Sequence, residues 1–171
     1  MDKKYIPLLF ALVPAIVILA FLASKLYTVS TGTEILLETA PVDPRDLFRG
    51  DYVILSYGIS SVSGVNSSDF KPGDSIYASL SKKEKFWTID TAGRNRPELA
   101  QNQVCLKGEV SSIFSDILRV SWGIESYFVP EGEGRPIERQ RVNLSVTVIV
   151  DSDCRGIVKE LLINDTAVKF G

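Results

Sequence analysis

The chain has 171 residues, of which 45% are hydrophobic and 23% are charged, which is enough for one ordinary domain and an appendage. Its 19 basic and 21 acidic residues are scattered and sum to a formal net charge of -2, so no basic footprint for nucleic acid exists. Histidine is absent, which excludes Ser-His and Cys-His catalytic pairs, histidine metal ligands and histidine pH switches.

The appendage is an apolar run near the N-terminus. The segment from Tyr5 to Ser24 contains no charged residue. As a helix it extends about 30 Å, the thickness of the hydrocarbon core of a bilayer. The sequence therefore predicts one membrane span over residues 5–24. A cleaved signal peptide is the alternative, but this run is longer than a usual signal core.

The flanking charges predict an orientation. Lys3 and Lys4 precede the apolar run, whereas only Lys25 follows it closely. Because positive charge is retained on the cytoplasmic side, the N-terminus is expected in the cytoplasm. We expect residues 1–27 to form a cytoplasmic tip and an uncleaved signal-anchor, and residues 28–171 to form an extracytoplasmic domain.

Alternating polarity predicts strands in the remainder of the chain. Residues 142–151 place Val142, Leu144, Val146, Val148 and Val150 on one face and Asn143, Ser145, Thr147 and Asp151 on the other, as in a half-buried strand. Residues 117–128 place Leu118, Val120, Trp122, Ile124 and Phe128 on the apolar side and Arg119, Ser121, Glu125 and Tyr127 opposite. Residues 51–59 place Val53, Leu55, Tyr57 and Ile59 on one face.

Further strands are predicted at 34–39, 75–81, 86–90, 104–114, 156–163 and 167–170, with a turn through "KKEK" between the second and third of these. A short helix is expected near "RPIERQR" and an irregular loop over 95–102. Short strands at this spacing predict a mainly β fold, an antiparallel β-sandwich or open barrel of about eight strands.

Two segments begin a strand through Gly-Asp, at Gly50-Asp51 and at Gly73-Asp74. Glycine tolerates the positive φ of a tight turn, and the aspartate carboxylate can accept hydrogen bonds from the backbone amides that follow it. A structural role therefore explains these pairs, and a polar platform for a partner is the alternative. The charged residues just before the first pair are expected to form surface ion pairs of little net energy.

"WGIESYFVPEGEG", at 122–134, forms a second candidate segment. If the strands that carry Arg49–Tyr57 and Trp122–Phe128 lie side by side, Glu125 can pair with an arginine of the first segment and hold the two together. This structural clamp is favoured over a groove that binds a peptide or a membrane protein, although arginine mixed with aromatic residues is typical of interfaces. The candidate binding or clamp residues are Asp43, Arg45, Asp46, Arg49, Gly50, Asp51, Tyr52, Leu55, Tyr57, Glu125, Tyr127, Phe128, Pro130, Glu131 and Gly132.

These segments carry a family resemblance. "GDYVILSY" resembles the signature of the GDYXXLXY family, which Gly50, Asp51, Tyr52, Leu55 and Tyr57 match. The similarity continues through "RPELAQNQVCLKGEV", "WGIESYFVPEGEG" and "DSDCRGIVKELLIND", and it departs at 92–102 and at Cys154. The resemblance implies a bacterial or archaeal membrane-anchored protein without an established activity, often found beside polytopic membrane proteins.

The expected function is a non-catalytic binding or assembly module in the prokaryotic cell membrane, with a neighbouring membrane or envelope protein as partner. No cofactor, metal or catalytic residue is predicted, and a small-molecule ligand stays undefined. The alternative is an envelope hydrolase similar to the type I signal peptidases. However, "PRDLFRGD" has no serine before Gly50-Asp51, and Lys82, Lys83 and Lys85 lie in a polar hairpin where a desolvated lysine base is hard to form.

The chain contains two cysteines, Cys105 and Cys154. Cys105 is expected in a strand and Cys154 in a turn, which favours two separate thiols. The alternative is a disulfide that closes a loop of about 50 residues.

Overall fold

The computed structural model describes residues 6–39, 52–128, 130 and 144–168, with the backbone alone for residues 6–11, 24–29, 52 and 53. The chain divides into two compact units, Met1–Gly32 and Thr33–Gly171. The sequence predicts the boundary a few residues earlier, after residue 27. The elements in chain order are α1 (Ile6–Thr31), β1 (Thr33–Glu38), β2 (Tyr52–Ile54), the 3-10 turn η3 (Gly58–Ser60), β3 (Ser61–Val62), the 3-10 turn η4 (Ser67–Asp69), β4 (Ser75–Lys83), β5 (Phe86–Gly93), β6 (Gln103–Phe114), β7 (Ile117–Ser121), β8 (Ser126–Phe128), β9 (Leu144–Val150), β10 (Gly156–Ile163) and β11 (Thr166–Ala167).

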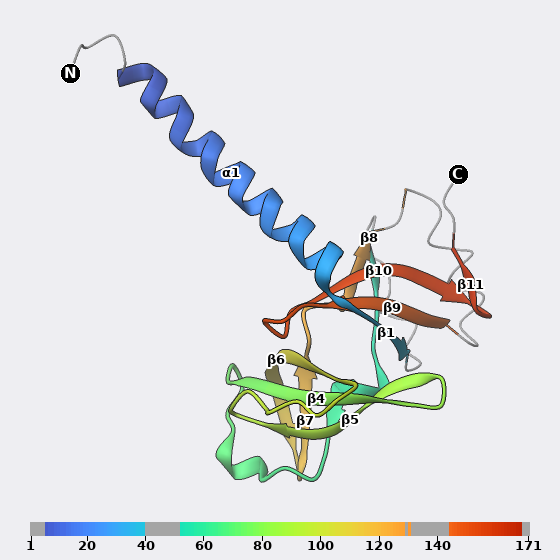
Figure 1. Cartoon of the computed structure of the whole chain (residues 1–171). Coiled ribbons are helices and arrows are strands. Elements are labelled where there is room, and N and C mark those ends of the chain that lie inside the picture. The colour runs from blue at the N-terminus through green and yellow to red at the C-terminus, as the bar shows by residue number, and fades with distance from the viewer. Residues whose placement is uncertain (1–5, 40–51, 129, 131–143, 169–171) are drawn as a thin grey trace. The chain divides into compact units, whose positions relative to one another are not determined.

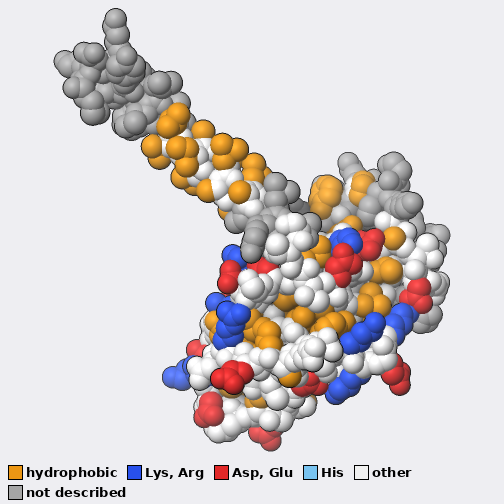
Figure 2. Space-filling view, viewed as in Figure 1, with side chains coloured by type: hydrophobic (Ala, Val, Ile, Leu, Met, Phe, Trp, Pro, Cys, Tyr) orange, Lys and Arg blue, Asp and Glu red, His pale blue; other side chains and the backbone are white. Residues whose placement is uncertain are grey.

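The first unit is the helix α1, which continues through Pro14 for 26 residues. Its large apolar side chains between Leu12 and Leu22 are all more than half exposed. Figure 2 shows them as a continuous apolar surface along the described part of the helix. In the part of the chain that the structure describes, no helix reaches the combination of length and apolar character needed to cross a membrane.

The second unit is an antiparallel β structure, and the prediction of a mainly β fold is confirmed. A five-stranded sheet has the order β3-β7-β6-β4-β5, a four-stranded sheet has the order β1-β9-β10-β11, and β2 pairs with β8 (Figure 1). All strand pairs are antiparallel, which short hairpin connections allow. Eleven strands lie within the described residues, against about eight predicted. The predicted strand 117–128 is divided into β7 and β8, and the two-residue strand β3 was not predicted.

One hydrophobic core unites the two larger sheets. The four-stranded sheet contributes Ile35, Leu37, Val146, Val148 and Leu161, and the five-stranded sheet contributes Val62, Ile76, Ala78, Leu80, Leu106, Val110, Leu118 and Val120. Segments between strands add Leu55, Tyr57, Ile59, Trp122 and Ile124. Half of these side chains were predicted to face inward by alternation, among them those of β7 and β9, so the inner faces of these two strands are confirmed.

The outer face of β9 differs from the prediction. Ser145 and Thr147 were expected on the polar, exposed face, yet they are buried, and so is Ile149 beside them. β9 lies between β1 and β10, and Thr147 lines a small cavity with Lys82 and Trp87 of the β4–β5 hairpin. The prediction that β9 is half-buried is therefore wrong, because alternating polarity does not show what covers the second face of the strand.

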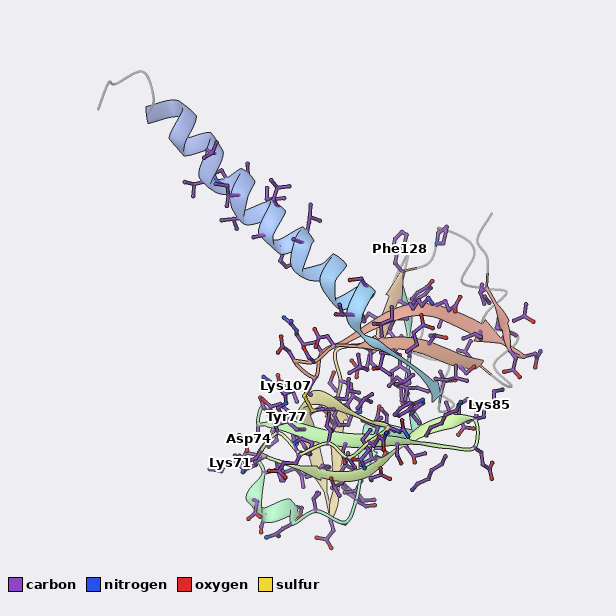
Figure 3. The ribbon with its side chains drawn as sticks, in the orientation of Figure 1. Lys71, Asp74, Tyr77, Lys85, Lys107 and Phe128 are labelled. Atoms are coloured by element: carbon purple, nitrogen blue, oxygen red, sulfur yellow. A yellow bond between two sulfur atoms is a disulfide. The ribbon has the colours of Figure 1, made fainter. Side chains whose placement is uncertain are left out.

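Phe128 also differs from the prediction. The alternation placed it with Trp122 and Ile124 on the apolar side, but it is 58% exposed whereas those two are buried. Gly123, with a φ of +76°, turns the chain between β7 and β8. Ile124, directly after Gly123, keeps its predicted inward position. Residues 122–125 belong to no strand, and β8 pairs with β2 in another sheet, so the period of two of β7 does not extend to Phe128. Figure 3 shows the Phe128 side chain directed away from the sheets.

The remaining sequence predictions have mixed outcomes. β10 has the predicted bounds, the "KKEK" segment turns at Glu84 and Lys85, and residues 96–100 contain no regular element. The helix expected near "RPIERQR" and the extension of the last strand beyond residue 168 lie outside the described residues.

Cys105 and Cys154 form a disulfide, so the prediction of two separate thiols is wrong. Cys105 lies in β6 and Cys154 in the turn between β9 and β10, with their Cα atoms 4.8 Å apart. The backbone adds a second link, because the amide of Lys107 donates to the carbonyl of Cys154 at 2.7 Å. The turn itself is closed by the buried carboxylate of Asp151, whose Oδ1 accepts from the amides of Asp153 and Arg155, each at 2.9 Å.

Loss of the disulfide is expected to destabilise the second unit. A bridge between residues 49 positions apart restricts the unfolded chain by about 4 kcal/mol in the chain-entropy model. Reductant should therefore lower the thermal unfolding midpoint of the wild type. The double variant Cys105→Ser/Cys154→Ser should start from the lower midpoint and not respond to reductant. An unchanged midpoint of the wild type after complete reduction, verified by thiol alkylation and mass spectrometry, would contradict this expectation.

Gly108 is expected to tolerate no side chain. A Cβ at this position in β6 would lie 2.6 Å from side-chain atoms of both Trp122 and Val120 and 2.7 Å from the carbonyl oxygen of Ser121. Overpacking of this kind costs about 1–3 kcal/mol. Gly108→Ala should lower the free energy of unfolding by that amount in denaturant titration. Gly93→Ala is the matched control, because a Cβ there meets nothing within 4 Å.

Candidate functional site

The two candidate segments are neighbours in space. β2 pairs with β8 in the register Tyr52 with Phe128 and Ile54 with Ser126. Beyond the strand pair, the amide of Leu55 donates to the carbonyl of Glu125 at 2.7 Å. The condition on which the clamp prediction rested, that the two segments lie side by side, is therefore confirmed.

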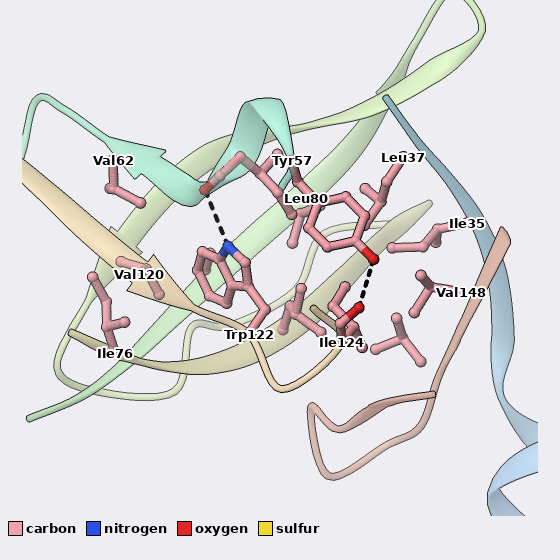
Figure 4. Close-up of a cluster of buried hydrophobic side chains, with 14 of the residues drawn as sticks. Ile35, Leu37, Tyr57, Val62, Ile76, Leu80, Val120, Trp122, Ile124 and Val148 are labelled. Carbon is pink, nitrogen blue, oxygen red and sulfur yellow. Dashed lines mark hydrogen bonds between the residues drawn. The ribbon is translucent and has the colours of Figure 1, made fainter. Parts of the chain in front are cut away.

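Tyr57, the last residue of the "GDYVILSY" signature, is buried and fastens the first segment to the second. It is 1% exposed, and its hydroxyl donates to the carbonyl of Ile124 at 2.6 Å (Figure 4). A buried hydroxyl without such an acceptor would cost free energy, so this bond defines where the ring can lie. Burial, and secondarily the negative charge of Glu125, raises the pKa of Tyr57 far above its ordinary value, so the phenol is neutral.

Trp122 makes the reciprocal connection. Its indole Nε1 donates to the carbonyl of Ile59 at 3.1 Å (Figure 4). Its ring packs against Gly108 of β6. Each segment thus inserts one aromatic ring whose polar atom donates to the backbone of the other segment. We call the side chains of Tyr57 and Trp122, with their acceptors at Ile124 and Ile59, the aromatic lock.

Glu125 has a partner within its own turn. Its carboxylate accepts a hydrogen bond from the backbone amide of Trp122, across the turn in which Gly123 has its positive φ. The predicted ion pair between Glu125 and an arginine of the first segment is not tested, because Arg45 and Arg49 lie outside the described residues. The observed connection between the segments uses backbone carbonyls and aromatic donors, which the sequence did not indicate as the connecting groups.

Several other predicted site residues lie outside the described residues, namely Asp43, Asp46, Gly50, Asp51, Glu131 and Gly132. The backbone of Tyr52 is in β2, but its side chain is not described. Leu55 is buried in the core, Tyr127 and Pro130 are half-buried, and Phe128 is exposed. The structure therefore brings Leu55, Tyr57 and Glu125 together and does not place the charged residues of "PVDPRD".

The second Gly-Asp turn shows how such a pair closes. Gly73 has a φ of +93°, as predicted for its turn. The Asp74 carboxylate, however, accepts from the preceding amide of Lys71 at 2.8 Å and from the Arg94 guanidinium at 2.6 Å (Figure 3). The Lys71 amide and then Arg94 hold the pKa of Asp74 below its ordinary value. The prediction that the carboxylate accepts hydrogen bonds from the amides after the aspartate is wrong. The turn instead brings the amide of Lys71, which precedes the aspartate, to the Asp74 carboxylate.

A cavity lies at the open side of the five-stranded sheet. β3 and β5 are the two outermost strands of this sheet, and residues of both line one cavity of about 560 Å³. The sheet therefore curls into a half-barrel whose two edges face each other across this space, which we call the edge groove. Its lining residues are Glu38, Gly58, Ile59, Ser61, Val62, Ser63, Gly64, Val65, Phe86, Trp87, Thr88, Ile89, Asp90, Thr91 and Ala92.

The edge groove joins the aromatic lock at Ile59, which lines the groove and whose carbonyl accepts the hydrogen bond from Trp122. Its chemistry is mixed. Trp87, Ile89 and Val62 supply apolar surface, and Glu38 and Asp90 are charged, whereas no lining residue is basic. Sequence reasoning missed this site because the alternation of Trp87 and Ile89 predicts a strand but not that the strand is at an edge.

The chemistry available to the described residues is limited. They contain no group of three or more acidic or cysteine side chains arranged to hold a metal ion. The three lysines considered for a protease, Lys82, Lys83 and Lys85, are all exposed. Two of them pair with acids, Lys83 with Asp90 at 3.7 Å and Lys85 (labelled in Figure 3) with Asp165. Such lysines lack the apolar surroundings that would make an ammonium group a base.

Removal of the Tyr57 hydroxyl is expected to weaken the aromatic lock. Tyr57→Phe keeps the ring and leaves the buried Ile124 carbonyl without its donor, which costs about 1–3 kcal/mol of unfolding free energy. The matched control is Tyr77→Phe on β4, where the half-buried ring lies under Lys107 Nζ at 5.6 Å and the hydroxyl forms no bond within the described residues. Equal stability losses in the two variants, measured in denaturant, would contradict the assigned role.

The raised pKa of Tyr57 also predicts that its contribution to the unfolding free energy depends on pH. The folded protein holds the pKa of Tyr57 above the value of 10.0 of a free tyrosine, so above pH 10 the unfolded chain releases a proton that the folded chain retains. The stabilisation due to Tyr57 is therefore complete below pH 10 and falls as the pH rises further. The difference in unfolding free energy between wild type and Tyr57→Phe should be constant up to pH 9 and shrink as the pH rises above 10.

Comparison with known proteins agrees with the signature at the centre of this site. No curated protein and no solved structure is significantly similar to the chain. The family model described as "GDYXXLXY protein" matches residues 14–161, which include the signature strand, the aromatic lock and both cysteines. The chain therefore belongs to the GDYXXLXY protein family.

Proposed function

We propose that this protein is a membrane-tethered, extracytoplasmic β-domain that binds or assembles with another membrane or envelope protein and carries out no catalysis. The tether is residues 5–24, with the N-terminus in the cytoplasm and the β unit on the far side of a prokaryotic cell membrane. The binding part is the Thr33–Gly171 unit, with the edge groove as its binding surface.

The tether is supported by the sequence and by the exposure of α1. The run from Tyr5 to Ser24 has no charge, and the positive charges gather before it. The apolar side chains between Leu12 and Leu22 are more than half exposed and need an apolar environment. The Cys105–Cys154 disulfide adds support for the extracytoplasmic side, because disulfides persist in oxidising compartments and are rare in the cytosol.

The binding role depends on one observation, the edge groove. A cavity of about 560 Å³ is within the usual size range of ligand sites, and it has apolar walls with a few polar groups. Its walls contain serines and threonines but neither a lysine nor a cysteine beside them. The groove therefore has surface for recognition and lacks an activated nucleophile.

Photocrosslinking in intact cells tests the binding role. A benzophenone amino acid in place of Ser63, an exposed groove residue, should give a discrete adduct with a membrane or envelope protein identified by mass spectrometry. The same group in place of Asp116, an exposed residue of the β6–β7 turn outside the groove, is the control and should give none. Identical adducts from both positions, or none from Ser63, would contradict a binding role for this surface.

Labelling in the same cells tests the tether. Ser68→Cys lies on the exposed surface of the β unit, and a membrane-impermeant maleimide should label it in intact spheroplasts. Lys3→Cys should react only after lysis, and the wild type reports any background from its two disulfide-bonded cysteines. Labelling of Lys3→Cys but not Ser68→Cys before lysis would reverse the orientation.

A further inference from the structure

The Cys105–Cys154 disulfide is enclosed in the folded β unit. Cys105 is 3% exposed and Cys154 is 0% exposed. Thiol–disulfide exchange requires that a thiolate attacks one of the sulfur atoms directly. A thiolate is charged, and a charge is costly to bring into a buried site. Neither a reductant nor an oxidant can therefore reach these sulfur atoms while the surrounding structure stays closed.

The β9–β10 turn carries Cys154, so the burial of this sulfur depends on how the turn docks on β6. The carbonyl of Cys154 accepts from the amide of Lys107 in β6 at 2.7 Å. The guanidinium of Arg96, in the segment between β5 and β6, donates to the carbonyl of Ser152. Neither hydrogen bond involves a sulfur atom, so both can form in a chain whose cysteines are still reduced.

Asp151 holds the turn in its docked conformation. Its side chain is 4% exposed, and its Oδ1 accepts from the amides of Asp153 and Arg155 at 2.9 Å each. Cys154, between these two residues, has a φ of +64°. A residue with a side chain adopts this left-handed conformation only where its surroundings impose it. Loss of the Asp151 carboxylate should therefore let the turn relax and expose Cys154.

This arrangement determines when the bridge can form. In a folded but reduced chain, the docked turn would enclose both thiols just as it encloses the disulfide. An oxidant that arrives after docking has to wait until the turn opens, whereas an oxidant that acts during folding meets two accessible thiols.

We infer that the bridge is introduced during folding, by thiol–disulfide exchange with a dithiol oxidase outside the cytoplasm, and that docking of the β9–β10 turn then protects it from further exchange. The location of the oxidase rests on the proposed function, which places the β unit outside the cytoplasm. The protein is thus a client of such an oxidase, and its own bridge is not a redox switch.

The exchange is balanced between these two partners. The thiolate of one cysteine attacks the oxidase disulfide, which forms a mixed disulfide and releases one oxidase sulfur as a thiolate. The thiolate of the other cysteine then attacks the sulfur of the first, which forms the Cys105–Cys154 bridge and releases the second oxidase sulfur. The cysteine pair gives up two electrons and two protons, and the oxidase disulfide becomes a dithiol.

The order of folding and oxidation can be tested with the full-length chain in detergent micelles. The chain is reduced and unfolded in urea, diluted to refold, and given oxidised glutathione either at once or after tryptophan fluorescence shows that folding is complete. Alkylation and mass spectrometry count the remaining thiols. Early addition should form the bridge at least about tenfold faster than late addition. If the reduced chain does not refold, the reverse reaction decides, because dithiothreitol should reduce the native bridge at least about tenfold more slowly than the bridge of the urea-unfolded chain.

Two acids of the same turn provide a variant and its matched control. Asp151→Ala removes the buried acceptor of two turn amides and should speed reduction of the native bridge about tenfold. Asp153→Ala removes a side chain that is 66% exposed and bonded to the Arg155 guanidinium at 2.9 Å, and it should leave the rate unchanged. Asp151→Asn, which removes the charge and keeps the shape, should give a smaller acceleration and replaces Asp151→Ala if that variant does not fold.

The oxidase is tested in cells. Cys154→Ser leaves a mixed disulfide on Cys105 without the thiol that resolves it. After acid quenching and alkylation, non-reducing electrophoresis should show an adduct that reductant removes and that mass spectrometry assigns to a protein with a dithiol pair. The variant Cys105→Ser/Cys154→Ser is the control and should give no adduct.

Four results would overturn the inference. Reduction of the native bridge at the rate of the unfolded chain would show that the turn does not protect it. Oxidation of the folded chain as fast as that of the refolding chain would remove the need for an oxidase during folding. Equal rates in the Asp151 and Asp153 variants would exclude the turn as the gate, and absence of the adduct would exclude the oxidase. If any of these occurs while the maleimide labelling and the Ser63 photocrosslink succeed, the proposed function stands.

The opposite case is also distinguishable. If the labelling reverses the orientation while the rates are as expected, only the location of the oxidase fails, because the rates are measured in micelles and do not depend on the compartment.

Discussion

The aromatic lock is the interaction on which the arrangement of this β unit depends. Tyr57 and Trp122 belong to segments more than sixty residues apart, and each donates from a buried ring to the backbone of the other segment. A hydrogen bond of this kind is costly to leave unmade once its groups are buried, so the two segments keep one relative position. The lock lies where the short β2–β8 pair meets the core of the two larger sheets, and it thereby couples all three sheets.

Two further connections hold the sheets around this lock. Gly108 allows the Trp122 ring to approach β6 at a distance that no side chain would permit. On the other side of the core, the Cys105–Cys154 disulfide and the Lys107-to-Cys154 hydrogen bond join the β9–β10 turn to β6. A covalent bridge, a backbone bond and a packed ring therefore all act on one strand, β6, which lies in the middle of the five-stranded sheet.

These connections all involve the central strand, and the two outermost strands of the five-stranded sheet, β3 and β5, do not pair with each other. Because the sheet curls, β3 and β5 approach each other without pairing, and the edge groove is the space between them. An open strand edge is a liability for a β-domain, since exposed backbone groups can pair with other chains. The proposed binding function follows from this one geometric feature.

The sequence by itself determined the class of the fold and the contents of its core. Alternating polarity located β1, β4, β6, β7, β9 and β10 and the inward residues Leu55, Tyr57, Trp122 and Ile124, because a strand buried on one face must repeat with a period of two. The signature "GDYVILSY" likewise identified the family without any structure.

The tertiary structure decided everything that depends on which segments meet. The disulfide, the lock acceptors at Ile59 and Ile124, and the burial of both faces of β9 all join residues far apart in the chain, and periodicity carries no information about such pairs. Phe128 was misassigned because the predicted strand 117–128 is interrupted at 122–125 and continues as β8 in a different sheet. The sequence did not indicate the edge groove either. A strand at the edge of a sheet and a strand at its centre can have the same local sequence and differ only in their neighbours.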